Sequence, residues 1–131
     1  MPPANVTGMG TRKSNVLTET SLRLLMATPM PRPLWEAITG DDFHLRLGNA
    51  PAITRRADAL DALEAFLARL TGVGRDYWAA WRFDEAIFVE SELAYRAGPR
   101  REASIPCTMV ARVADAELLD LRLHLDPSPI P

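Results

Sequence analysis

The chain has 131 residues, of which 47% are hydrophobic and 24% are charged. This length supports one domain with a buried core and is too short for two. The formal net charge of −2 at pH 7 argues against a nucleic-acid partner, because nucleic-acid binders of this size usually carry a basic face.

Two short helices are predicted in the first part of the chain. Ser14 and Thr18 are alternative N-caps for a first helix that carries the sequence SLRLLM, since hydroxyl side chains satisfy free backbone N–H groups. Pro31 and Pro33 break this helix. Pro33 also suits the first turn of a second helix, LWEAI, which stops at Gly40.

One strand and the longest helix follow. Phe43, Leu45 and Leu47 share one face of the alternating sequence DDFHLRL, which is typical of a strand. Leucines at helical spacing then predict a helix from Ala57 to Leu70. Gly72, just beyond it, favours an ending there.

From this point the hydrophobic pattern has a period of two residues, which predicts four strands. Their connections are short, so the strands form an antiparallel meander. Helices first and a long sheet last favour an α+β fold, with a curved antiparallel sheet wrapped around the N-terminal helices and a cone-shaped pocket between them. The predicted strands are RDYWAAWRF, AIFVESELAYR, ASIPCTMVARV and ELLDLRLHLD.

The sequence also bears on compartment and cofactors. Cys107 is the single cysteine, so the chain forms neither an internal disulfide nor a thiolate metal site. It has no apolar run long enough to cross a membrane and no secretory signal. We therefore predict a cytoplasmic protein with no membrane partner, in which residues 1–16 are a flexible leader and residues 17–131 form the domain. The excess of arginine over lysine is typical of GC-rich bacterial genomes.

The order of several segments carries a family resemblance. LRLGNAP, the helix DALEAFLARL, the strand end ELAYR, then SIPCTMVARV and LRLHLDPSP resemble the SnoaL-like branch of the nuclear transport factor 2-like superfamily, which has a cystatin-like cone fold. That superfamily is similar in fold to ketosteroid isomerases, polyketide cyclases and limonene-epoxide hydrolases, and it also holds members that only bind ligands. No quoted segment is a catalytic signature, so the fold does not fix the activity.

The resemblance implies a small, mostly apolar or ring-containing ligand in the cone, no cofactor, and a homodimer formed through the outer face of the sheet. It also implies which residues line the cone. Glu92 is the candidate acid or base of an isomerase, cyclase or dehydratase, Glu90 is its modulating neighbour, and Asn49 is a donor to a substrate oxygen or water. The implied pocket residues are Leu47, Ala94, Ile105, Cys107, Leu121, Leu123 and Leu125.

Two observations keep a non-catalytic binding or interaction module open as the alternative. The partner residues of the epoxide hydrolase site fall on Glu90, Leu47 and Leu123, so that active site is broken here. The strand that carries the two glutamates also has a second possible phase. In that phase Val89, Ser91, Leu93 and Tyr95 line the core, and both glutamates lie on the surface.

Other chemistry-bearing residues have structural interpretations. His44 and His124 fall on the faces opposite the leucines of their strands, and no clustered ligand set predicts a metal. Trp78 and Trp81 are three residues apart on one strand and point to opposite faces. One of them should fill the cone, and the other should lie on the outer face, where an aromatic residue suits a dimer interface.

Overall fold

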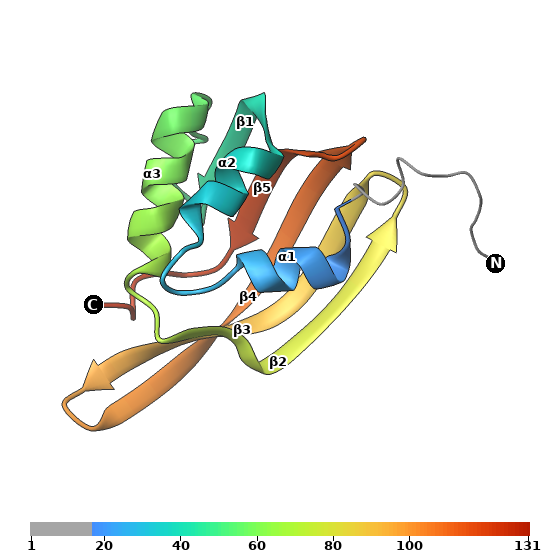
Figure 1. Cartoon of the computed structure of the whole chain (residues 1–131). Helices are drawn as coiled ribbons and strands as arrows, with labels where there is room; N and C mark the ends of the chain where they lie inside the picture. The colour runs from blue at the N-terminus through green and yellow to red at the C-terminus, as the bar shows by residue number, and fades with distance from the viewer. Residues whose placement is uncertain (1–16) are drawn as a thin grey trace.

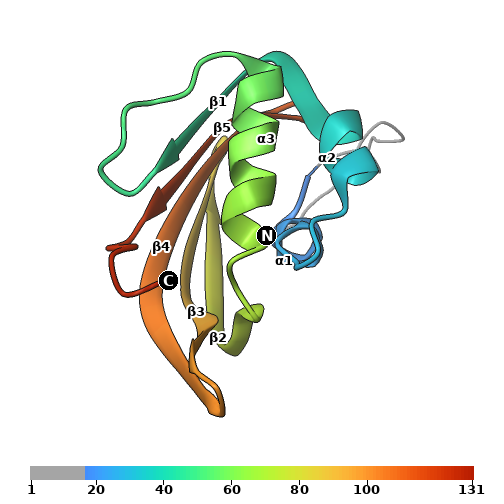
Figure 2. The ribbon, with the colours of Figure 1, turned by 90° about the vertical axis from the view of Figure 1, so that its left-hand side faces the viewer.

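Three helices lie on one face of a curved, open five-stranded sheet (Figures 1 and 2). This computed structural model describes residues 17–131, and the predicted leader lies outside the described residues. The α+β prediction is confirmed. In chain order the elements are α1 (Glu19–Leu25), α2 (Arg32–Ile38), β1 (Thr39–Leu47), α3 (Arg56–Leu67), β2 (Gly72–Phe83), β3 (Ala86–Gly98), β4 (Arg101–Ala114) and β5 (Glu117–His124).

The helix boundaries follow the expected signals. Thr18 is the N-cap of α1, and its hydroxyl oxygen accepts a hydrogen bond from the Ser21 N–H at 3.1 Å. Pro33 lies in the first turn of α2. Backbone N–H groups in the first turn have no acceptor within the helix, so a proline there costs no hydrogen bond. The third helix ends at Leu67, three residues earlier than predicted. No helix within the described residues is long and apolar enough to span a membrane.

The strand order in the sheet is β1-β5-β4-β3-β2. The last four strands form the predicted antiparallel meander. The sequence did not indicate where β1 pairs, and it lies parallel to β5. The final strand therefore has a hydrogen-bonded neighbour on both sides, which explains why its leucines can be fully buried on one face.

The core fills the space between the helices and the concave face of the sheet. Inward-facing side chains of all five strands meet the leucines of α3 there. Trp35 of α2 is fully buried, and its indole Nε1 donates to the Leu25 carbonyl oxygen at 2.9 Å. The largest fully buried side chains are Trp35, Phe43, Leu22, Met26, Leu45, Leu60, Leu63, Leu67, Ile87, Leu93, Met109 and Leu118. Much of the predicted cone is thus packed with side chains.

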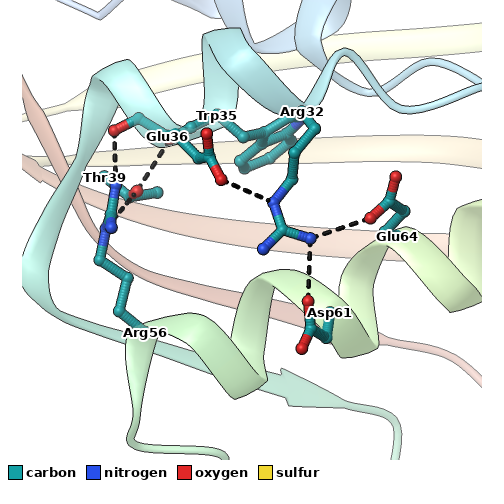
Figure 3. Close-up of polar contacts among 7 residues, drawn as sticks. All are labelled: Arg32, Trp35, Glu36, Thr39, Arg56, Asp61 and Glu64. Atoms are coloured by element: carbon teal, nitrogen blue, oxygen red, sulfur yellow. Dashed lines mark hydrogen bonds and ion pairs between the residues drawn. The ribbon is translucent and has the colours of Figure 1, made fainter.

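An ion-pair network holds α2 against α3 (Figure 3). The Arg32 guanidinium reaches Glu36 at 3.1 Å on its own helix, and Asp61 at 3.0 Å and Glu64 at 2.9 Å on α3. The bond to Asp61 is the main cause that raises the pKa of Arg32 above its usual value. One cation thus lies between carboxylates of two helices and offsets part of their mutual repulsion.

We expect Arg32→Met to lower the free energy of unfolding by about 1 kcal/mol, because partly exposed ion pairs are each worth only about 0.2–1 kcal/mol. Urea unfolding followed by circular dichroism measures the change. The loss should shrink in 1 M NaCl, where the screening length is about 3 Å. Arg55→Met is the control, since Arg55 is highly exposed and its one acidic neighbour among residues 17–131 is Asp58, at 3.8 Å. Equal losses in the two variants would contradict the prediction.

Candidate functional site

An apolar groove of about 370 Å³ lies between α3 and the ends of β1 and β5. Its volume falls at the lower end of the range of about 300–1,000 Å³ typical of small-molecule sites. Two predicted pocket residues, Leu47 and Leu125, form its sheet side. The full lining is Leu47, Ala50, Ala62, Ala65, Phe66, Arg69, Leu125 and Pro127.

The hollow on the helix side is a consequence of residue size. Ala62 and Ala65 are three residues apart on α3, so they share a face, and their side chains leave the space open. Phe66 is buried beside them and closes the groove toward the core. Arg69 follows just after the helix and is the one titratable residue in the lining. Sequence reasoning missed these four residues, although two alanines beside the leucine stripe were a visible signal.

The segment of residues 126–131, here called the C-terminal strap, closes one side of the groove and returns to the end of α3 (Figure 1). Ile130 is buried in the core. Arg69 donates from Nη2 to the Ile130 carbonyl oxygen at 2.8 Å and from Nε to that of Pro131 at 3.2 Å. The Asp126 carboxylate accepts from the Ser128 N–H at 3.1 Å, and this bond lowers the pKa of Asp126. The strap is thus anchored by both apolar burial and hydrogen bonds.

The turn after β1 places Asn49 at the rim of the groove. Asn49 is exposed and lies between Leu47 and Ala50, which both line the groove. Gly48 has φ of +58°, and a Cβ there would meet the Leu125 carbonyl oxygen at 3.1 Å. A residue without a side chain is therefore needed where this turn approaches the start of the strap.

The predicted orientation of Glu90 and Glu92 is wrong. In the register of β3 with β4, they pair with the exposed residues Thr108 and Pro106 on the outer face of the sheet. Ala94 pairs with Ser104, is buried at 3% exposure and does not line the groove. Glu90 is exposed, Glu92 is half-buried, and Glu92 accepts a hydrogen bond from the Ser104 hydroxyl at 2.7 Å. Any chemistry of these two carboxylates would have to take place on the face opposite the groove.

The second strand phase, with Val89, Ser91, Leu93 and Tyr95 inward, is the observed one. Its physical reason is burial: this face is the more apolar one, and an unpaired carboxylate on the inner face would lose its hydration. A small notch of about 180 Å³ lies beside the two glutamates on the outer face, with Tyr77 in its lining. That volume is below the usual range for a ligand site.

The remaining predicted pocket residues belong to the core and not to the groove. Cys107, Leu121 and Leu123 are buried in the core, and Ile105 packs against it. Burial raises the pKa of the Cys107 thiol to about 12, so the thiol stays protonated at neutral pH. Within residues 17–131 no group of three or more His, Cys, Asp or Glu side chains could hold a metal ion.

The outer face of the sheet carries exposed aromatic residues, and no described helix covers it (Figure 2). Trp81 is 53% exposed and pairs directly with Phe88, which is 38% exposed. Trp78 is half-buried against the core. The prediction that the two tryptophans lie on opposite faces is confirmed.

Comparisons with known proteins identify the fold. No protein-family model matches the sequence, and no curated protein matches it. The fold is similar to that of a protein described as a SnoaL-like polyketide cyclase from Jannaschia sp., with a TM-score of 0.64 and 16% identity over 92% of this chain and 91% of that one. A protein from Catenulispora acidiphila with a ketosteroid isomerase-like fold, in complex with trimethylamine, gives 0.65 and 13% over 88% and 91%.

A nuclear transport factor 2-like protein of unknown function from Cytophaga hutchinsonii is also similar, with a TM-score of 0.61 and 14% identity over 72% of this chain and 84% of that one. At such identities the likeness is one of fold. The chain has the SnoaL-like, nuclear transport factor 2-like fold, as the sequence resemblance implied.

The buried Cys107 thiol predicts a loss of stability at alkaline pH. Between the ordinary thiol pKa of 9.0 and the folded-state pKa of about 12, the unfolded chain releases a proton that the folded chain keeps. The Cys107 contribution is therefore complete below pH 9 and falls by up to about 1.4 kcal/mol per pH unit above it. Urea unfolding from pH 8 to pH 10.5 should show a steeper decline for the wild type than for Cys107→Ala. Parallel profiles would contradict this.

Proposed function

We propose that this protein binds a small, mostly apolar molecule in the groove between α3, β1 and β5, and that it does so without catalysis. The observation that carries the proposal is the separation of groove and carboxylates. Glu90 and Glu92 lie on the outer face, while the groove lining contains no carboxylate, histidine or thiol among the described residues. A proton-transfer enzyme needs an acid or base within hydrogen-bond reach of its substrate.

The lining supports an apolar ring as the bound group. Its aliphatic residues and Phe66 offer dispersion contacts to a ligand, and burying their apolar surface against it makes the free energy of binding more favourable. Asn49 at the rim offers an amide to a polar substituent that extends out of the groove. The complex of a similarly folded protein with trimethylamine is consistent with small-ligand binding on this fold.

Filling the groove should weaken binding. We expect Ala65→Phe to weaken the binding of a neutral ring compound, 2-naphthamide, at least tenfold in isothermal titration calorimetry. Ala65 is exposed in the open hollow, so the larger side chain needs no rearrangement of the core. Ala57→Phe, in the first turn of the same helix and also exposed, is the matched control and should bind normally.

Two results would count against this proposal. Undiminished binding by Ala65→Phe would place the site elsewhere. A loss of binding in Glu92→Gln would show that the outer-face glutamates take part in ligand binding, and it would favour the enzyme alternative.

The partner proposed for the outer face is a second copy of this chain. Trp81, Phe88, Val110, Arg122 and Arg46 are in register across the sheet, from β2 to β1. One end of this row is aromatic and the other is cationic. A two-fold axis near its centre sets the arginines of each copy over the aromatic residues of the other, which is a self-complementary arrangement.

Placing a charge in the aromatic end should separate the copies. We expect the wild type to be a dimer in size-exclusion chromatography with light scattering, and Trp81→Arg to be a monomer, because the new cation would face the arginines of the other copy. Leu34→Arg is the control, since Leu34 on α2 is 57% exposed and lies away from the sheet. A monomeric wild type at 100 µM would disprove this mode of assembly.

A further inference from the structure

Among the side chains that line the groove, one is polar, and it carries a positive charge. All other lining residues are apolar, whereas Arg69 brings a full positive charge to the end of the groove nearest the strap. From this asymmetry we infer that the ligand is an amphipathic acid, with a ring or short chain in the hollow and a carboxylate, or a similar anion, on Arg69. The inference rests on the proposed function of the groove.

The hydrogen bonds of Arg69 leave one edge of its guanidinium available. Nε and Nη2 donate to the carbonyl oxygens of Pro131 and Ile130, while no described residue accepts a hydrogen bond from Nη1. A guanidinium has five N–H donors in a planar fork. The Nη1 and Nη2 edge can therefore take both oxygens of a carboxylate side by side.

The strap prepares Arg69 for this role. The two bonds to its carbonyl oxygens fix the guanidinium plane before a ligand arrives, and Ile130 holds the strap in the core. A side chain that is already ordered loses less conformational entropy when it binds. The strap thus acts as a positioning element for Arg69 as well as a wall of the groove.

The other charges near the groove are the partial charge at the end of α3 and carboxylates that lie outside the lining. The end of α3 contributes a partial negative charge of about half a unit, which is smaller than the unit charge of Arg69. The Asp126 carboxylate accepts a hydrogen bond from Ser128 and is not part of the lining. Asp61 and Glu64 lie outside the lining and share the single charge of Arg32 with Glu36. The free Nη1 and Nη2 edge of Arg69 is therefore the group in the lining that favours an anion, through charge-assisted hydrogen bonds.

The test compares two probes of one shape, 2-naphthoate and 2-naphthamide, by isothermal titration calorimetry with the whole chain at pH 7.5. We expect the wild type to bind naphthoate about tenfold more tightly, because charge-assisted hydrogen bonds exceed neutral ones by this order. In Arg69→Met the ratio of the two affinities should fall to about one, with naphthamide binding retained. Arg69→Lys, which keeps the charge and loses the fork, should give an intermediate ratio.

Two controls separate recognition by Arg69 from the structural role of the strap. Arg55→Met makes the same charge change at the other end of α3, about 20 Å away by helical rise, and should leave the ratio unchanged. Ile130→Ala loosens the strap but keeps the guanidinium, so it should lower the ratio of the two affinities less than Arg69→Met does.

The outcomes are distinct. Equal affinities of the wild type for both probes, or an unchanged ratio in Arg69→Met, would overturn the acid assignment and leave the groove as a binding site for neutral molecules. If neither probe bound to the wild type, the proposed function itself would fail, and the acid assignment would fail with it.

Discussion

The arrangement of the helices depends on the burial of Trp35. Its indole fills the centre of the core and donates to the Leu25 carbonyl oxygen, which ties the end of α1 to α2. The Trp35 carbonyl oxygen accepts from the Thr39 hydroxyl at 2.8 Å, and that hydroxyl in turn accepts from Arg56 Nε at 3.0 Å. Arg56 also donates to the Glu36 carbonyl oxygen at 2.6 Å (Figure 3). The buried ring ties α1 to α2, and the hydrogen bonds of the Trp35 carbonyl, Thr39 and Arg56 extend this connection to β1 and the start of α3. Since buried polar groups are costly unless they are paired, this chain of bonds permits few other placements of the helices.

The position of the groove follows from that placement. The third helix presents its leucines to the sheet and its acidic side chains Asp61 and Glu64 to Arg32 of α2. Its remaining side, with Ala62 and Ala65, faces neither the sheet nor α2 closely enough to be filled. The strap and the turn at Gly48 lie across the groove from this side of α3 and form its other wall. The groove is therefore the space left over when the other two sides of the helix are packed, and its shape is set by elements that are rigid for other reasons.

The sequence predicted the elements well because hydrophobic periodicity is a local property. All eight elements were found in order, and the inward leucines of β5 were assigned correctly. The phase of β3 stayed open, because the family resemblance implied inward glutamates whereas the greater apolarity of the face that carries Val89 and Leu93 favoured the phase that is observed. The groove was only half predicted, through Leu47 and Leu125. Its other part depends on Arg69 meeting the strap across 61 and 62 residues of chain, and no periodicity encodes a contact at such a separation.

The size of the groove limits how tightly apolar contact alone can bind. At roughly 30 Å³ per non-hydrogen atom, as in liquid water, a volume of about 370 Å³ holds about a dozen atoms. At about −0.5 kcal/mol per atom, between the limits for very small and drug-sized ligands, this gives roughly −6 kcal/mol, a Kd of tens of micromolar. Larger apolar ligands gain little, because the strap and α3 already close the two long sides. Affinity beyond this range has to come from polar recognition, and within the groove lining Arg69 is the residue that can supply it.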